Sequence, residues 1–272
     1  MIVNASNSLV PHATLPPLEH VPLTDWQLVY EPAEDTYLLC DALAQDVSRF
    51  YGATLIVEVG PGSGTVSSCL LDLLRGGNGG SRGSAAPPAV VIAVDVSPHA
   101  CRVTRETARA AGVSSRLDIV QADLLGPLVQ RLRGAVDIFL FNPPYVPTPL
   151  DEVPLPGAEL YALGCGGEDS LPAAWAGGED GRVVIDRALH LCAATLRRPT
   201  KKKNNIINNN NDGDSGWDSG GVAYWVLVEE NRPNDVMARL QADGLETKIV
   251  ASRRAANERL HILRITWPLL PQ

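Results

Sequence analysis

The sequence has few cysteines and no two of them at C-x-x-C spacing. The five cysteines are an odd number in mostly apolar surroundings, so we expect buried free thiols in a reducing compartment. The five histidines are scattered and never stand at ligand spacing, which predicts that there is no metal site. No apolar run approaches the ~18 residues of a membrane-spanning helix, and the N-terminus lacks the pattern of a signal peptide. These absences predict a soluble, cytoplasmic protein with no membrane partner, and the Lys201–Lys203 run leaves an additional nuclear location open.

The sequence also has no excess of basic residues. Its 272 residues include 23 Lys and Arg against 31 Asp and Glu, a formal net charge of −8. Broad binding to nucleic-acid phosphate needs a basic face, so this charge argues against nucleic acid as a partner. Hydrophobic residues make up 45% of the chain, which is enough for a substantial core.

Three segments differ from the rest in composition. Residues 1–25 contain several prolines and little periodicity, which predicts an extended N-terminal arm. Residues 76–88 are rich in glycine, and residues 199–221 combine a lysine run with an asparagine tract, so both are predicted to be flexible insertions. The remaining length suits one domain, and we expect residues 26–272 to form a single domain around these insertions.

Between these segments, predicted strands and helices alternate. Apolar, β-branched runs predict seven strands, at 54–59, 89–94, 117–120, 135–141, 222–228, 246–251 and 259–267. Helical patterns predict helices at 65–74, 98–111, 180–196 and 234–243. This order is typical of an α/β fold with a mainly parallel sheet and helices on both faces. The last connection is too short for a crossover helix, so the last two strands should be antiparallel.

The first site signal is the glycine-rich sequence EVGPGSG at residues 58–64, directly after the first predicted strand. Gly60, Gly62 and Gly64 favour a tight turn and close approach of a ligand, and the helix that follows offers unpaired N–H groups. The spacing differs from the dinucleotide pattern G-x-G-x-x-G because Thr65 stands where the third glycine would be. This difference argues against NAD.

An acidic residue follows each of the next two strands. Asp95 can accept both hydroxyls of a ribose, or it can stabilise the start of the helix at Pro98. Asp123 can bind an adenine amino group, or it can cap the next turn. Because the carboxyl ends of parallel strands meet at one edge, where open α/β sheets bind ligands, we favour the binding role for both.

The fourth predicted strand ends in Asn142-Pro143-Pro144-Tyr145. The prolines restrict the backbone and remove two donors, so the carbonyls of Asn142 and Pro143 are expected to face a pocket. The side-chain oxygen of Asn142 adds an acceptor, and Tyr145 adds an aromatic face. Such a set suits a planar –NH2 group whose lone pair is aimed at an electrophile. Because an amide or aromatic amine is a poor nucleophile, positioning and a charged methyl donor must supply most of the acceleration.

Together these motifs resemble those of class I S-adenosylmethionine-dependent methyltransferases of the HemK-like glutamine N5 type. Three further segments narrow the match, namely VYEPAEDT at 29–36, AWAGG at 174–178 and Asp186-Arg187. The combination is similar to the eukaryotic members of this family, which methylate the GGQ glutamine of the class-1 translation release factor. The resemblance covers roughly residues 26–267 apart from the insertions, and it implies a Rossmann-like fold.

The resemblance also implies a cofactor and a set of site residues. The cofactor would be S-adenosylmethionine, with S-adenosylhomocysteine as its product. The implied cofactor contacts are Tyr30, Thr36, Glu58, Gly60, Gly62, Gly64, Asp95, Asp123, Leu124 and Asn142. The implied substrate contacts are Asn142, Pro143, Pro144 and Tyr145, of which Asn142, Pro143 and Tyr145 would be catalytic. Residues 30–36 have a simpler alternative, in which acidic residues of a first helical turn favour the helix dipole.

Two partners are implied by the same resemblance. One is the translation release factor as protein substrate. The other is a small zinc-binding activator protein that forms a heterodimer by adding strands to the sheet edge. In this fold the third strand is the edge, so Leu117–Gln121 is the expected contact.

Other functions remain open from the sequence. An adenine amino group in DNA would suit the same pocket, but the acidic charge and the lack of room for a target-recognition domain argue against it. A histone lysine is a further alternative, although its amine is not planar. The chain could also be a binding scaffold without turnover, against which the complete set of site residues argues.

Overall fold

One central β-sheet organises the chain, and the computed structural model describes residues 13–76, 88–153, 174–200 and 220–269. The strands are β1 (Leu55–Val59), β2 (Val90–Asp95), β3 (Leu117–Gln121), β4 (Ile138–Phe141), β5 (Val222–Val228), β6 (Glu246–Ala255) and β7 (Glu258–Thr266). The α-helices are α1 (Glu34–Gln45), α2 (Thr65–Gly76), α3 (Pro98–Ala110), α4 (Val129–Leu132), α6 (Val183–Thr195) and α7 (Pro233–Ala242).

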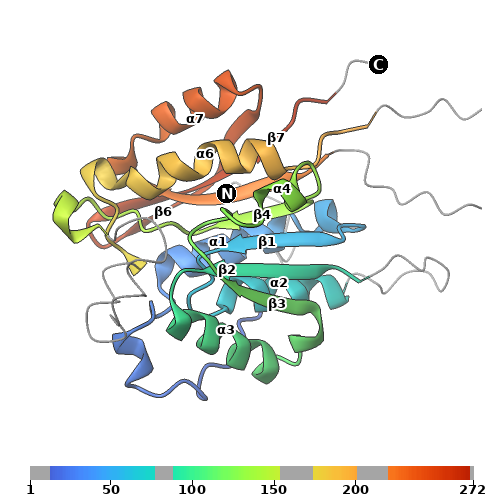
Figure 1. Ribbon diagram of the computed structural model, residues 1–272, viewed down its shortest axis with the longest axis vertical. Coiled ribbons are helices and arrows are strands. Elements are labelled where there is room, and N and C mark those ends of the chain that lie inside the picture. The colour runs from blue at the N-terminus through green and yellow to red at the C-terminus, as the bar shows by residue number, and fades with distance from the viewer. Residues whose placement is uncertain (1–12, 77–87, 154–173, 201–219, 270–272) are drawn as a thin grey trace, which may run out of the picture.

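The strand order in the sheet is β3-β2-β1-β4-β5-β7-β6 (Figure 1). Strands β1 to β5 pair in parallel, whereas β7 runs antiparallel to both of its neighbours, β5 and β6. The reversal follows from the short turn between β6 and β7, because a tight turn can join only antiparallel strands. The predictions of a seven-stranded, mainly parallel α/β sheet with antiparallel final strands and of β3 at its edge are therefore confirmed.

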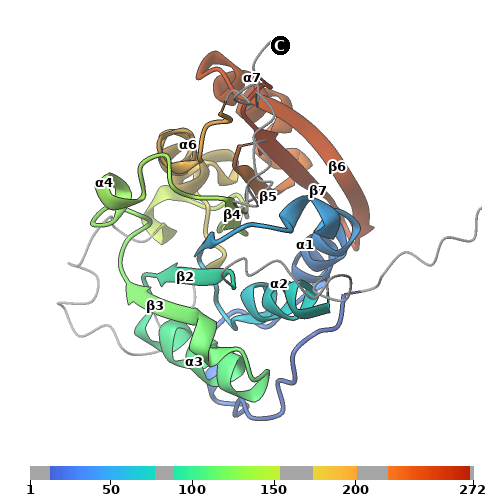
Figure 2. The same cartoon turned by 90° about the vertical axis from the view of Figure 1, so that its right-hand side faces the viewer.

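Helices cover both faces of this sheet, with α1, α2 and α3 on one side and α4, α6 and α7 on the other (Figure 2). Alternate residues of β4 point to opposite faces of the sheet. Ile138 belongs to the apolar cluster on one face and Phe139 to the cluster on the other. In β5, Tyr224 and Trp225 divide in the same way, and every residue of this strand is buried. Burial on both faces explains why these strands are apolar throughout rather than alternating.

The N-terminal segment packs along α3 before it reaches α1. Val21 and Val29 of this segment join Val103 in a small apolar cluster. Asp25 accepts an ion-paired hydrogen bond from Arg102 of α3 at 2.7 Å. These contacts place the residues after Val29 near the carboxyl ends of β1 and β4, where they enter the pocket described below.

Several predicted boundaries differ from the structure. The strand expected at 135–141 begins at Ile138, because Val136 makes an isolated bridge with Leu196 instead of a ladder. The helix expected from residue 180 begins at Val183, because Asp180 and Gly181 both have positive φ angles that a helix does not accept. The short helix α4 was not predicted. Most of each predicted insertion, at 77–87 and 201–219, lies outside the described residues.

The described cysteines agree with the sequence prediction, whereas Cys165 lies outside the described residues. Cys40, Cys69, Cys101 and Cys192 are free and buried. Within the described ranges, no helix has the length and apolar character needed to cross a membrane.

Candidate active site

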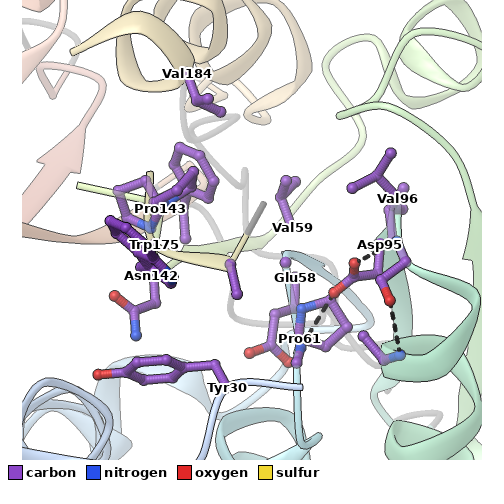
Figure 3. A pocket seen from close by; sticks show the side chains of 18 of the residues that line it. Tyr30, Glu58, Val59, Pro61, Asp95, Val96, Asn142, Pro143, Trp175 and Val184 are labelled. Carbon is purple, nitrogen blue, oxygen red and sulfur yellow. Dashed lines mark hydrogen bonds between the residues drawn. The ribbon is translucent and has the colours of Figure 1, made fainter. Parts of the chain in front are cut away.

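A pocket lies at the carboxyl ends of β1, β2 and β4, lined by the loops that follow the first four strands and by the N-terminal segment. In Figure 3, Asn142, Pro143 and Trp175 lie on one side of it, with Asp95 and Val96 on the other. Tyr30 lies below Asn142 in this view, and Glu58 lies between the two sides. The pocket therefore gathers groups from segments that are far apart in the sequence.

The glycine-rich turn forms the floor between β1 and α2. Gly60 and Gly62 have φ angles of +66° and +54°, in the left-handed region where a residue with a Cβ is strained. A Cβ on Gly60 would lie 3.7 Å from the carbonyl oxygen of Asn142, so this turn lies directly against the loop after β4. Gly64 does not line the pocket, since a Cβ there would meet the backbone of Thr104 in α3. Gly64 thus allows close packing against α3, and its role in cofactor binding stays a prediction.

Two buried carboxyl groups lie at the carboxyl ends of β1 and β2. Glu58 is 3% exposed, and both the backbone N–H and the hydroxyl of Ser67 donate to it. Asp95 accepts hydrogen bonds from the N–H groups of Ser97, at 2.8 Å, and Gly62, at 3.2 Å. Burial raises the pKa of Glu58 to about 7 and that of Asp95 to about 6. Both would gain from a cationic or hydroxyl-bearing ligand, which stabilises a carboxylate that has lost its water.

Asp95 performs the structural role that the sequence left open, at the start of α3, and it also lines the pocket. Its carboxylate holds the turn before α3, whose N-cap is Ser97, and it also ties the glycine-rich turn to β2 through Gly62. Asp123 and Leu124 line the same pocket beyond the end of β3. The Asp123 side chain pairs with Arg187 of α6, and Leu124 has a φ angle of +50°, which bends the chain around the pocket.

The Asn-Pro-Pro-Tyr loop after β4 closes the opposite side. The side-chain NH2 of Asn142 donates to Asp35 at 2.9 Å, whereas its side-chain oxygen is buried and has no hydrogen-bond partner. Tyr145 donates its hydroxyl to the same carboxylate at 3.2 Å. The backbone of the loop is held separately, because the side-chain NH2 of Asn231 donates to the carbonyl oxygen of Tyr145 at 2.8 Å.

The segment before α1 completes the wall. Tyr30 and Thr36 both line the pocket, and both donate hydrogen bonds to Asp35. Burial and the neighbouring Asp35 carboxylate raise the pKa values of Tyr30 and Tyr145, so both hydroxyls stay protonated and act as donors. Tyr30, Asp35 and Thr36 therefore line the site, and the last two also start the helix.

Apart from Gly64, every residue that the sequence singled out lines this one pocket. Sequence reasoning assigned no site role to Asp35, Trp175 or Arg187, which also line it. A signal for Asp35 was present, because Leu38 and Leu39 follow it at helical spacing and are buried. Burying an acidic side chain on the apolar face of a helix costs free energy unless hydrogen-bond donors or cations pair with it. Such a residue therefore indicates a site.

The strand order and this pocket define the chain as a class I methyltransferase. A solved structure described as the E. cuniculi Mtq2-Trm112 complex responsible for methylation of the eRF1 translation termination factor is 25% identical in sequence. The alignment covers 88% of this chain and 99% of that one, with a TM-score of 0.51. No family model matches the sequence.

Comparison with known proteins identifies the family. The chain is 34% identical over 256 residues to Methyltransferase HEMK2 of Mus musculus, covering 94% of this chain and 98% of that protein. It is 32% identical over 254 residues to the eRF1 methyltransferase catalytic subunit mtq2 of Schizosaccharomyces pombe, covering 89% and 91% of the two chains. The protein belongs to the HEMK2/Mtq2 family of methyltransferases.

Proposed function

We propose that this protein transfers a methyl group from S-adenosylmethionine to the side-chain amide nitrogen of the GGQ glutamine in the eukaryotic release factor. The observation that carries the proposal is the side-chain oxygen of Asn142, in the Asn-Pro-Pro-Tyr loop that lines the pocket. This oxygen is a buried acceptor without a hydrogen-bond partner. A primary amide offers two N–H donors in one plane, which this oxygen and a neighbouring backbone carbonyl can accept. The relatives named for eRF1 methylation support the choice of substrate.

The pocket also suits S-adenosylmethionine. The cofactor carries a ribose diol, a positively charged ammonium group and a sulfonium centre. Asp95 and Glu58 supply buried carboxylates, Asp123 lies beyond β3 for the base, and Leu28 and Val29 provide apolar surface. A cation in this place would lower the raised pKa of Glu58, because it offsets the cost of burying the carboxylate.

The chain's own residues contribute mainly by positioning. The bound cofactor supplies an electrophilic methyl group. Asn142 and Pro143 hold the amide nitrogen by its hydrogens, and the aromatic ring of Tyr145 supports its plane. With that methyl group transferred, the amide nitrogen would gain an N–CH3 bond in exchange for the S–CH3 bond, the sulfur would become neutral, and one amide proton would pass to solvent. S-adenosylhomocysteine is left as the product.

The charges around the pocket argue against the alternative substrates. Burial and the nearby charges of Glu230 and Asp35 raise the pKa of Glu258. The charge of Glu258 in turn helps to raise the pKa values of Tyr30 and Tyr145. The substrate end is therefore surrounded by acidic groups, which repel the phosphates of DNA. A lysine amine would be attracted here, but it is tetrahedral and would not match two acceptors arranged for a planar –NH2 group.

As part of the same proposal, a small activator protein binds the β3 edge, and the complex acts in the cytoplasm. The related E. cuniculi protein forms a complex with Trm112. In this chain β3 is the outermost strand at one edge of the sheet. Asp118 and Gln121 are exposed there, and Ile119 and Val120 are only half-buried. An added strand would pair the free backbone groups and cover this apolar surface.

The decisive experiment replaces Asn142 by Ala in the complex with the activator and measures methylation of the release factor by mass spectrometry. We expect methyl transfer to fall by about 10²-fold or more, a loss of the size seen when one preorganised hydrogen-bonding group is removed. The dissociation constant for S-adenosylhomocysteine should change little. Asn257→Ala, in the exposed turn between β6 and β7, is the matched control. If Asn142→Ala methylates the glutamine at the wild-type rate, the amide pocket is wrong.

A further inference from the structure

Asp35 is a buried carboxylate that no step of the proposed reaction uses. It lies in the first turn of α1 and is 2% exposed, whereas its neighbour Glu34 is exposed. One of its oxygens accepts hydrogen bonds from the backbone N–H of Thr36, at 2.7 Å, and from the hydroxyls of Thr36 and Tyr30. Stabilising the helix dipole requires none of this burial, because an exposed carboxylate at the same turn would do so.

The second oxygen of Asp35 faces the substrate end of the pocket. It accepts from the side-chain NH2 of Asn142 at 2.9 Å and from the hydroxyl of Tyr145 at 3.2 Å. One carboxylate therefore contacts two side chains of the Asn-Pro-Pro-Tyr loop, 107 and 110 residues away in the sequence. The backbone of that loop has its own support from Asn231, so Asp35 acts on the side chains rather than on the fold of the loop.

The contact with Asn142 decides which end of its amide the pocket presents. The oxygen and NH2 ends of an amide have nearly the same shape, so sterics alone do not choose between the two orientations. An ionised carboxylate only accepts hydrogen bonds, and it therefore fixes the NH2 end toward itself. The oxygen end is then left buried and without a hydrogen-bond partner, as observed.

We propose that Asp35 is the positioning residue that holds the Asn142 amide with its oxygen toward the substrate, and that it thereby makes the pocket selective for an –NH2 acceptor. The inference deepens the proposed function and rests on it for the identity of the substrate. Without Asp35 the amide can turn and present its own NH2 group, which cannot bind a second donor. The substrate nitrogen would then lose one of the two contacts that aim it.

A reversed pair of residues tests this role directly. In Asp35→Asn, the NH2 group of the new amide can donate to the Asn142 oxygen. The Asn142 amide then turns and presents its NH2 group, instead of its oxygen, to the substrate. In the double variant Asp35→Asn with Asn142→Asp, the donor now comes from position 35, and the carboxylate at 142 again presents an acceptor to the substrate. Asp41→Asn is the matched control, because Asp41 lies on the same helix and pairs with Arg253 away from the pocket.

The kinetic readout uses the complex with its activator, S-adenosylmethionine and the release factor. We expect Asp35→Asn to lower kcat by about 10²-fold while KM for S-adenosylmethionine changes less than about threefold. The reversed pair should recover at least about tenfold of the lost kcat, because contacting residues are strongly coupled. Wild-type kcat in Asp35→Asn, or no recovery in the reversed pair, would overturn the positioning role.

A second readout does not depend on the methyl acceptor. In a ¹⁵N-labelled protein, the side-chain NH2 signal that Asn142→Asp removes identifies Asn142. We expect Asp35→Asn to shift this signal and speed its hydrogen exchange, since the charge-assisted hydrogen bond is lost. An unchanged signal overturns the role of Asp35. If wild type fails to methylate the release factor but the signal responds, the proposed function fails and the positioning of Asn142 stands.

Discussion

Glu58 makes the apo protein less stable as the pH rises. Its pKa is about 7 in the folded protein against an ordinary value of 4.5, because burial penalises the carboxylate more than the two hydrogen bonds from Ser67 offset it. A group whose folded pKa is raised contributes stability that is complete below its unfolded pKa. That stability is lost as the pH rises through the folded pKa. The effect is therefore confined to the range from about pH 4.5 to about pH 7.

The perturbation that isolates this effect is Glu58→Gln. The variant keeps an oxygen for the two Ser67 donors but does not titrate. With each pKa unit equivalent to about 1.4 kcal/mol, the wild-type protein should lose roughly 2 to 3 kcal/mol relative to the variant between pH 5 and pH 8. We thus expect the variant to be the more stable protein at pH 8, although it lacks the charge that we propose for cofactor binding.

The assay is urea unfolding of both proteins without cofactor, at several pH values between 5 and 8.5. Subtracting the two free energies of unfolding at each pH removes the titration of groups that do not interact with Glu58. Asp95, whose own raised pKa lies near 6, repels the Glu58 carboxylate, so its titration contributes to the same difference. A parallel titration with S-adenosylhomocysteine should show weaker binding by the variant. A difference that does not change with pH would refute the burial argument, as would a variant that is less stable at pH 8.

Two further predictions concern packing around the pocket. Gly64→Ala should lower the free energy of unfolding by about 2 kcal/mol or more, because its φ angle is +77° and the new Cβ would lie 2.8 Å from the Cα of Thr104. Urea unfolding measures this loss, and a neutral effect would show that α2 and α3 pack less closely. Arg102→Ala should speed amide hydrogen exchange at residues 25–30 and weaken cofactor binding, because Asp25 loses the ion pair that ties this segment to α3. Arg105→Ala, on the exposed side of α3, is the control, and equal exchange in both variants would contradict the anchoring role.

The sequence predicted elements well where the signal was local. The run 222–228 matches β5 residue for residue, since a strand buried on both faces is apolar throughout. The helix predicted from residue 98 begins at Pro98, directly after its N-cap Ser97. Predictions were less accurate where a boundary depended on contacts elsewhere, as at Val136, which bridges to Leu196 instead of extending β4.

For the site residues too, the sequence predicted what depends on local signals better than what depends on distant contacts. The sequence could place three sets of groups in one pocket, because parallel strands bring their carboxyl ends to one edge. These are the glycines after β1, the carboxyl groups at the end of β2 and after β3, and the Asn-Pro-Pro-Tyr loop after β4. Gly64 has a packing role that its spacing did not indicate, since a Cβ there would meet Thr104, and its predicted role in cofactor binding stays a prediction. Nothing in the sequence near Gly64 distinguishes a glycine needed for a ligand from one needed for a neighbouring helix.

The sequence by itself determined the order of strands and helices, the chemistry of each loop and the acidic charge of the chain. These properties depend on periodicity, turn residues and composition, which are local. Only the tertiary structure decided that Asp35 contacts Asn142 and Tyr145. That contact depends on how α1 packs against the sheet and on the need of a buried carboxylate for donors, and both are settled by residues more than 100 positions apart.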